Sequence, residues 1–424
     1  MGIGGSGISA VAQIAKAYEF EVSGCDLEAS RNTHYLEKAG IPVQIGHDVS
    51  HLKNVSILAH TPAVFYQSSR NIEYLSAAKN KISMTWEEFM AKYLQKAKFV
   101  IAVAGTHGKG TTAAMLAYIL EIAGLDPTVE IGANLLDWEK RNYRIGKGNY
   151  FVCEADEFND NFLVFSPQLA IVTSIELDHP DYFANFDAVL RSFEKFTARL
   201  TGKKILILNK DNNGCVQLAK NISKKFKGKI IYYSALSKSK YKLKLPGEHI
   251  RSDASGAAAA AKALGVKESE IMNGLEGFGG LERRFEYKGE FEGVKVYDDY
   301  AHHPTAIAVN IKATREAFPK KKVWVVLQPH MHSRLQTLFE DFVKALRTAD
   351  RVVVTDVYTR REQGVCKPTG KELAIAVDSP KATYVGGDLL NVANFVKRNT
   401  TKKDVVIVMG AGDSYRVAEY LVSQ

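Results

Sequence analysis

The sequence lacks any apolar run near the roughly 18 residues that a helix needs to span a bilayer. Its opening segment, MGIGGSGISAVAQIAKAYEF, places no basic stretch ahead of an apolar run, unlike a signal peptide. Cysteine is scarce, and its four copies form no C-x-x-C pair (Cys25, Cys153, Cys215 and Cys366). Such spacing fits neither a disulfide framework nor a zinc site and favours a reducing compartment. We therefore expect a cytoplasmic chain that has no membrane partner.

The composition is otherwise ordinary for a globular protein, with 46% hydrophobic and 24% charged residues in a chain of 424. At roughly 150 residues per domain, this length suggests about three domains. The formal net charge is +9, and much of the excess lies in a Lys-rich stretch, 203–244. A basic chain can bind nucleic acid or a small anionic substrate. Because no aromatic motifs interleave these lysines, we interpret them as a solvated surface and expect no nucleic-acid partner.

Short β-branched runs alternate with longer helical stretches such as Thr112–Ala123. This alternation predicts an α/β fold with parallel, doubly wound sheets. We place one boundary near Lys98, before a new strand and glycine-rich loop, and another near Gly279–Gly280. The expected domains are therefore 1–97, 98–280 and 281–424. The runs predicted to be strands are Phe99–Ala104, Leu169–Ser174, Lys204–Leu208, Val323–Leu327, Arg351–Thr355 and Val405–Met409.

One glycine-rich segment follows an apolar strand and precedes the helical run AAMLAYILEIA. A turn in this position directs backbone N–H groups and a helix N-terminus at phosphate, and a lysine adds charge near the β/γ oxygens. Hydroxyls after the lysine can hold Mg²⁺. The spacing is shorter than G-x-x-x-x-G-K-[ST], and a plain glycine-rich turn is the alternative. We predict a phosphate site formed by Gly105, Thr106, His107, Gly108, Lys109, Gly110, Thr111 and Thr112.

A second glycine turn opens the chain as GIGGSG, followed by a helical pattern and then by Asp26. A glycine turn with an acidic residue about 20 positions later is the dinucleotide-binding fingerprint. Such a turn normally follows a strand, so we expect that a first strand is missing from this sequence. A packing turn without a ligand is the alternative.

Acidic and histidine residues follow two further apolar runs, as EADE at Glu154–Glu157 and ELDH at Glu176–His179. The carboxyl ends of parallel strands meet where ligands bind. Carboxylate and imidazole ligands around Mg²⁺ would stabilise charge on a transferring phosphoryl group. We therefore predict a metal site here, with ordinary surface acids as the alternative.

Two later motifs carry basic side chains: RRFE with DDYAHHP, and QPHMHSR directly after the strand VWVVL. An arginine such as Arg284 can clamp a phosphate with two hydrogen bonds. The adjacent His302 and His303 would point to opposite faces of a strand, which argues against a shared zinc ion. Arg334 is a candidate for binding a substrate carboxylate, and an ordinary helical arginine is the alternative.

These motifs, in this order, resemble the Mur ligases over essentially the whole chain. AVAGTHGK, EADE, DDYAHHPTAI, QPHMHSR and MGAGD carry the resemblance jointly. It implies a Rossmann-like N-terminal domain for a UDP-sugar, a P-loop central ATPase domain, and a Rossmann-like C-terminal domain for an amino acid. GIGGSGIS and QPHMHSR are most similar to members that join L-alanine to UDP-N-acetylmuramic acid. The implied cofactors are ATP and Mg²⁺, and the implied state is a monomer or homodimer.

The resemblance also implies roles for individual residues. Lys109, His179 and Arg284 would be catalytic, and Arg284 and Asp299 would join the phosphate loop in binding ATP. Thr111, Glu154 and His179 would hold the metal, while His330 and Arg334 would bind the amino acid. The UDP-sugar would contact Gly2, Gly4, Gly5, Ser6, Gly7 and Asp26.

Three departures from the family pattern stand out. Gly110 follows the lysine where threonine is usual, so Thr111 would supply the hydroxyl. Ile250 and Asp253 replace the two asparagines of the adenine motif H-N-x-x-N, and Met331 replaces a common arginine. These changes bear on ATP affinity and on the amino-acid pocket.

The implied reaction proceeds through an acyl phosphate of the lactyl carboxylate, which the amine of L-alanine then attacks, in peptidoglycan precursor synthesis. Closure of the third domain on ATP would exclude water. The alternatives are a ligase that attaches a tripeptide to the same sugar, folate polyglutamate synthetase, an oxidoreductase, and a non-catalytic nucleotide-binding homologue. The sequence leaves the choice among L-alanine, glycine, L-serine and tripeptide open.

Overall fold

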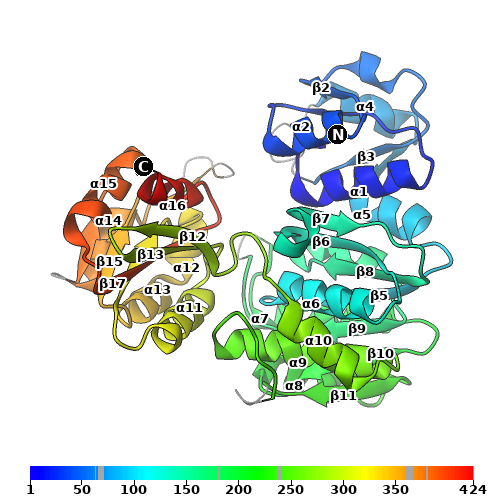
Figure 1. The fold of residues 1–424 in the computed structure, drawn as a ribbon. Helices are drawn as coiled ribbons and strands as arrows, with labels where there is room; N and C mark the ends of the chain where they lie inside the picture. The colour runs from blue at the N-terminus through cyan, green and yellow to red at the C-terminus, as the bar shows by residue number, and fades with distance from the viewer. Residues whose placement is uncertain are drawn as a thin grey trace. The chain divides into compact units, whose positions relative to one another are not determined.

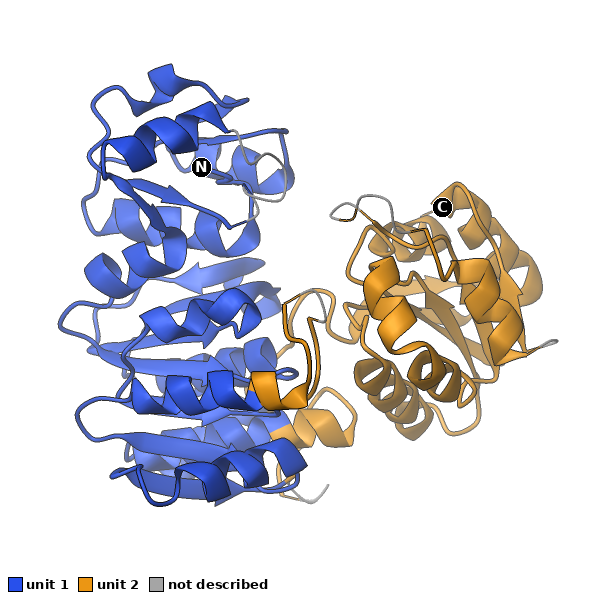
Figure 2. Ribbon diagram, turned by 180° about the vertical axis from the view of Figure 1, so that it is seen from behind, with its two compact units in different colours: residues 1–175, 190–234, 253–275 blue, residues 176–189, 235–252, 276–424 orange. Residues whose placement is uncertain are grey.

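The computed structural model describes residues 1–62, 64, 71–179, 182–235, 240–359, 362, 366–378 and 381–423. These residues form two compact units (Figure 2). Unit 1 contains Met1–Ile175, Leu190–Ser234 and Asp253–Leu275, and unit 2 contains Glu176–Val189, Ala235–Ser252 and Glu276–Gln424. Within the described ranges, no helix is long and apolar enough to cross a membrane.

The first part of unit 1 contains two small parallel sheets of two strands each (Figure 1). Strand β1 (Gly24–Asp26) pairs with β2 (Val43–Ile45), and β3 (Leu58–His60) pairs with β4 (Ser83–Thr85). Helix α1 begins directly after the first glycine turn and is buried almost continuously from Ile8 to Ala15. The helical elements here are α1 (Ser6–Ala17), α2 (Arg31–Lys38), η1 (Val49–Leu52), α4 (Ile72–Lys79), α5 (Trp86–Phe89) and η2 (Met90–Leu94).

The rest of unit 1 is built on a sheet whose described strands run in the order β11-β10-β9-β5-β8-β6-β7. Neighbours are parallel except β6 and β7. The central strand β5 (Phe99–Ala104) is buried from its second residue onward, which explains its continuous apolar run. The other strands are β6 (Thr128–Leu135), β7 (Arg141–Arg144), β8 (Tyr150–Ala155), β9 (Leu169–Val172), β10 (Ile205–Asn209) and β11 (Lys229–Tyr233).

Helices connect these strands, as the alternating pattern predicted. The helix after the phosphate loop, α6, is buried on nearly all sides because it packs on β5, β6 and β8. The helical elements in this stretch of the chain are α6 (Lys109–Ile122), η3 (Leu136–Trp138), η4 (Phe158–Val164), α7 (Phe186–Ala198), α8 (Asn213–Ile222), α9 (Glu248–Ala263) and α10 (Glu268–Gly277).

Unit 2 contains a sheet in the order β12-β13-β17-β14-β15-β16, parallel except for the edge strand β12. Successive residues of a strand face opposite sides. Accordingly, Val325 and Ile407 belong to the core on one face, and Val326 and Val408 to the core on the other. The strands are β12 (Glu286–Phe291), β13 (Val294–Asp299), β14 (Lys322–Leu327), β15 (Arg351–Val354), β16 (Ala382–Tyr384) and β17 (Asp404–Met409).

The helices of unit 2 cover both faces of this sheet, so its strands are doubly wound (Figure 1). They are α11 (Pro304–Ala317), α12 (His332–Thr337), α13 (Phe339–Leu346), α14 (Gly370–Val377), α15 (Leu389–Asn399) and α16 (Tyr415–Val422). All six runs predicted as strands are strands, within two residues at either end.

Candidate active site

The predicted phosphate loop joins β5 to α6 in unit 1. Gly105 (φ 136°) and Gly108 (φ 81°) have backbone conformations that favour glycine. A Cβ at Gly105 would lie 2.2 Å from Thr173 Oγ1, and one at Gly108 would lie 2.3 Å from Asp253 Oδ1. Ser174 anchors the loop. Its carbonyl oxygen accepts the N–H of Thr106 and its hydroxyl oxygen accepts the N–H of His107, each at 2.9 Å. The loop is therefore a fixed turn at the N-terminus of a buried helix, as a phosphate site requires.

Lys109 stands at the start of α6 with its ammonium group paired to acidic side chains. Nζ donates to Glu157 Oε2 at 2.7 Å and lies 3.3 Å from Asp156 Oδ1. Burial alone would lower the pKa of Lys109, but these carboxylates outweigh it and hold that pKa above its usual value. Burial raises the pKa of Glu157 to about 7. The lysine is therefore charged at neutral pH and already lies in the loop where a phosphate would compete for it.

Glu154 ends strand β8 beside the same helix. Its Oε2 accepts the backbone N–H of Gly132 at 2.8 Å. A Cβ at Gly110 would lie 3.1 Å from this oxygen, and one at Gly132 would lie 2.9 Å from it. Glycine at position 110 therefore makes room for the carboxylate of Glu154. Glu154 and the hydroxyl of Thr111 are hard oxygen donors, which fit Mg²⁺.

Asp253, which replaces an asparagine of the family's adenine motif, lies in α9 behind the loop. It accepts a hydrogen bond from Thr112 Oγ1 at 3.3 Å, and its carboxylate faces Gly108. This residue therefore supports the turn. Ile250, from the same motif, is buried and belongs to unit 2.

The N-terminal glycine turn and Asp26 come together, as the fingerprint predicted. The carboxylate of Asp26, at the end of β1, accepts the N–H of Gly4 at 2.7 Å. A Cβ at Gly4 would lie 2.9 Å from that oxygen. Ser6 begins α1 and donates its hydroxyl to the carbonyl of Gly132 at 2.8 Å. Gly2 and Gly5 belong to the turn, and Gly7 is the second residue of α1.

In unit 2, the two residues predicted to bind an amino acid lie side by side. Arg334 is in α12, nearly fully buried, and donates from one terminal nitrogen to His330 Nδ1 at 3.1 Å. Its Nε and other terminal nitrogen lie 3.0 Å from Asp178 Oδ1. Although burial opposes it, the guanidinium holds the pKa of Asp178 well below its usual range. Arg334 is therefore half of a buried ion pair and not an ordinary helical arginine.

Histidines from several segments lie near this ion pair. His179 follows Asp178 with a left-handed backbone (φ 53°) and places Nε2 3.9 Å from Asp178 Oδ2. The ring of His302 contacts that of His330, with centroids 5.8 Å apart. Burial, with Arg334 nearby, lowers the pKa of His302 well below its usual value. His303 instead caps α11 by accepting the N–H of residue 305 at 3.3 Å, so the adjacent histidines do separate.

Arg283 and Arg284 make different sets of contacts. Arg283 binds Asp298 and the carbonyls of Gly410 and Gly412, which joins β13 to the MGAGD turn. Arg284 instead places its guanidinium over the ring of Tyr300, 5.3 Å from the centroid. Asp299 is buried and accepts the N–H groups of residues 285 and 301 at 2.7 and 2.8 Å. Burial raises the pKa of Asp299, and Arg284 opposes the rise.

Three acidic residues that position the site were not among the predicted site residues: Glu157, Asp178 and Asp253. Glu157 and Asp178 belong to the EADE and ELDH motifs. The expectation that a buried lysine or arginine pairs with a carboxylate could have identified them as the partners of Lys109 and Arg334. Of the predicted metal ligands, Glu154 and Thr111 belong to unit 1, and His179 belongs to unit 2.

The chain matches three successive family descriptions: "Mur ligase family, catalytic domain" at residues 1–98, "Mur ligase middle domain" at 103–262 and "Mur ligase, glutamate ligase domain" at 283–412. It is 35% identical to a UDP-N-acetylmuramate–L-alanine ligase of Acetivibrio thermocellus, over 99% of this chain and 94% of that protein. The chain belongs to the Mur ligase family. The expected three-domain α/β fold and ATP-dependent amide-bond-forming ligase chemistry are thereby confirmed.

Other relatives are similar over comparable lengths. A UDP-N-acetylmuramate–L-alanine ligase of Caldicellulosiruptor bescii is 35% identical over 100% of this chain and 98% of that protein. A crystal structure of UDP-N-acetylmuramate–alanine ligase from Thermotoga maritima superposes with a TM-score of 0.81 at 28% identity, over 99% and 97% of the two chains. A murein peptide ligase of Psychrobacter arcticus shares the fold, with a TM-score of 0.70 at 20% identity over 99% and 97%.

Proposed function

We propose that this Mur ligase joins L-alanine to the lactyl carboxylate of UDP-N-acetylmuramic acid, with hydrolysis of ATP to ADP and phosphate. The observation that carries the proposal is a fixed phosphate loop with a charged Lys109, in a chain similar over its whole length to ligases of that name. We place the reaction in the cytoplasm and in peptidoglycan precursor synthesis, on which cell shape and division depend. The domain limits 1–97, 98–280 and 281–424 are part of this proposal.

The chemistry has two balanced steps. First, a lactyl carboxylate oxygen bonds to the γ-phosphorus while the bond from that phosphorus to the bridging oxygen breaks, which gives an acyl phosphate and ADP. Second, the amine of L-alanine bonds to the acyl carbon, phosphate leaves, and the amine proton goes to solvent. Activation is needed because a free carboxylate is a poor electrophile. The protein contributes positioning and charge stabilisation.

On the nucleotide side, the loop N–H groups and Lys109 would hold the β- and γ-phosphates. Lys109 would leave Glu157 to bind phosphate. Burial raises the pKa of Glu157 to about 7, so this carboxylate can take up a proton when the ammonium group moves away. Mg²⁺, held by Thr111, Glu154 and His179, would supply further neutralisation of phosphate charge. Arg284, whose guanidinium lies over the ring of Tyr300 and interacts electrostatically with Asp299, and Asp299 itself would add contacts to ATP.

On the acceptor side, the turn of residues 2–7 and Asp26 would bind the UDP portion. The carboxylate of L-alanine would meet His330 and Arg334, which already contact one another. Asp178 fixes the orientation of that guanidinium, and Nη2, which contacts Asp178 through one N–H, has a second N–H for another acceptor. With methionine at position 331, Arg334 is the cation that remains in the QPHMHSR motif.

The deciding experiment measures phosphate release from ATP in the presence of UDP-N-acetylmuramic acid and one amine. The amines are L-alanine, glycine, L-serine and the tripeptide that a recycling ligase would attach. We expect L-alanine to give the highest kcat/KM. Preference for the tripeptide would make the chain a recycling ligase, and no release with any amine would make it a non-catalytic nucleotide-binding homologue.

A further inference from the structure

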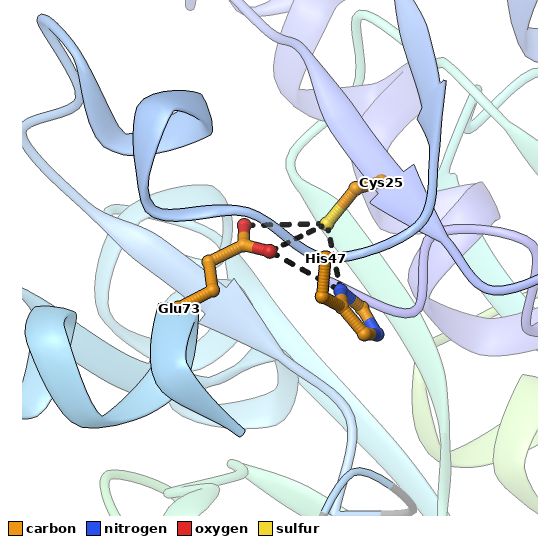
Figure 3. Close-up of side chains that lie close together, drawn as sticks. All are labelled: Cys25, His47 and Glu73. Atoms are coloured by element: carbon orange, nitrogen blue, oxygen red, sulfur yellow. Dashed lines mark hydrogen bonds and ion pairs between the residues drawn. The ribbon is translucent and has the colours of Figure 1, made fainter.

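A second cluster of ligand-type side chains lies in the first part of unit 1. It joins a thiol, an imidazole and a carboxylate from three separate segments: Cys25 in β1, His47 after β2, and Glu73 in α4 (Figure 3). Cys25 and Glu73 are buried, and His47 is mostly buried. None of these residues is needed for the ligase chemistry proposed above, so the cluster calls for its own explanation.

The donor atoms converge on one point. Sγ of Cys25 lies 3.3 Å from each oxygen of Glu73 and 3.4 Å from Nδ1 of His47. Nδ1 of His47 lies 3.2 Å from Oε2 of Glu73. One ligand atom from each residue thus lies within 4.8 Å of the other two.

These separations are those of atoms around a tetrahedral metal ion. With zinc–ligand bonds of about 2.0–2.3 Å, the edges of a coordination tetrahedron measure roughly 3.3–3.6 Å. The observed separations of 3.2–3.4 Å lie at or just below the lower end of that range. The donor set also selects the ion, because a thiolate with an imidazole favours zinc, whereas Mg²⁺ prefers oxygen ligands throughout.

A second histidine, His51, lies next to the cluster but outside the group of ligand atoms that are all within 4.8 Å of one another. Nδ1 of His51, in η1, lies 3.5 Å from Oε2 of Glu73. This nitrogen is buried and makes no hydrogen bond within the described part of the chain. A buried ring nitrogen without a hydrogen bond is costly, and a metal bond would satisfy it.

We propose that Cys25, His47 and Glu73 bind one Zn²⁺ ion, and that the side chain of the neighbouring His51 turns toward the ion as the fourth ligand. On binding, the S–H bond of Cys25 breaks, a sulfur–zinc bond forms, and the thiol proton passes to the buffer without any change in oxidation state. Burial raises the pKa of the metal-free thiol to about 12, with Glu73 adding to the rise, so without zinc the group is an S–H donor to that carboxylate.

The ion would have a structural role suited to this part of the fold. The sheets here have two strands each, and the buried clusters around them contain few residues. Zinc would tie β1, η1 and α4 together, and β1 ends at Asp26, which holds the glycine turn through Gly4. A metal crosslink of this kind contributes directly to folding.

The test uses the untagged full chain, because a histidine tag would itself bind zinc. After incubation with ZnSO₄ and gel filtration, we expect one equivalent of zinc per chain by mass spectrometry. With Co²⁺ in place of zinc, we expect a thiolate-to-cobalt charge-transfer band. Cys25→Ser, His47→Gln, His51→Gln and Glu73→Gln should each weaken zinc binding by about 100-fold or more, since the loss of even an outer-shell partner typically costs about 10–100-fold. Zinc should also raise the thermal midpoint of the wild type and not that of Cys25→Ser.

Matched controls separate this site from the others. Cys366→Ser removes an exposed thiol and Glu154→Gln alters the predicted Mg²⁺ ligand, and both should keep the zinc equivalent and the cobalt band. Thermal midpoints measured in EDTA will show whether each variant folds without metal. Absence of bound zinc in the wild type would overturn the proposal, as would an unchanged cobalt band in Cys25→Ser. Unchanged zinc affinity in His51→Gln would remove His51 from the ligand set.

Discussion

Lys109 and Arg334, two cations of the proposed chemistry, are each held by carboxylates within their own unit. Lys109 pairs with Glu157 and Asp156, and Arg334 pairs with Asp178. The two pairs differ in the pKa of the carboxyl group. The pKa of Glu157 is raised to about 7, whereas that of Asp178 lies well below its usual range. Lys109 can therefore leave its partner for phosphate, while Arg334 stays bound to Asp178.

Replacing Lys109 with alanine should reduce ATP-dependent product formation by about two orders of magnitude or more, since it removes a preorganised charge at the phosphates. Stability should change little, because Glu157 can protonate once its partner is gone. Phosphate release and thermal unfolding measure the two effects. Lys203→Ala, at an exposed lysine, is the control. Near-normal turnover of Lys109→Ala would disprove the phosphate assignment.

Replacing Asp178 with asparagine should lower the free energy of unfolding by about 3–5 kcal/mol, because it leaves a buried guanidinium without its anion. The folded pKa of Asp178 is lowered, so the pair stabilises fully above the unfolded pKa of about 3.9 and loses its effect as pH falls below it. Denaturant unfolding at pH 7 and pH 3 should show a smaller difference at the lower pH. Glu248→Gln breaks the exposed pair with Lys312 and should cost under about 1 kcal/mol.

At the scale of the element, the phosphate loop depends on glycines for two separate reasons. Gly105 and Gly108 have positive φ values, and their missing side chains also let Thr173 and Asp253 approach. Gly110 is within a helix, where glycine is unfavourable by roughly 1 kcal/mol relative to alanine. A side chain at that position would instead crowd Glu154, because a Cβ would lie 3.1 Å from its Oε2.

Comparison of Gly108→Ala with Gly265→Ala should separate the effect of backbone strain from the effect of the contact with Asp253. The two glycines have similar φ values, 81° and 87°, but a Cβ at Gly265 meets nothing within 4 Å. Both variants should lose about 1–2 kcal/mol from the left-handed backbone. Only Gly108→Ala should also displace Asp253 and raise the KM for ATP. Equal effects of the two variants on the KM would show that the contact with Asp253 is unimportant.

At the scale of the whole molecule, stability should depend on pH through buried neutral histidines. Burial, with Arg251 and Arg284 nearby, lowers the pKa of His249 to about 4, and burial also lowers the pKa of His302 well below its usual value. Both histidines are harder to protonate in the folded chain than in the unfolded chain. As the solution becomes acidic, both therefore lower the free energy of unfolding.

The folded pKa of His249 is below its unfolded value of about 6.5, so its neutral form stabilises fully above pH 6.5. As the pH falls from 6.5 towards 4, the unfolded chain takes up the proton first, and we expect a loss of roughly 2–3 kcal/mol from this group. His249→Asn should flatten that part of the profile of unfolding free energy against pH, with His302 accounting for what remains. His34→Asn, at an exposed histidine, should leave the profile unchanged. A wild-type profile that is flat from pH 7 to pH 4.5 would contradict the prediction.

The sequence by itself determined the α/β class, the strand positions and the phosphate loop. These features follow from short-range rules: apolar runs between glycine turns, and a lysine at a helix start. It also placed Asp26 with the first glycine turn, because that spacing reflects one strand–turn–helix unit. The tertiary structure alone decided which charges meet. Asp178 and Arg334 are 156 residues apart, and Thr112 and Asp253 are 141 apart, so no local pattern could pair them. The same reason hides the cluster of Cys25, His47 and Glu73, whose ligands are scattered through the sequence and converge only when the chain folds.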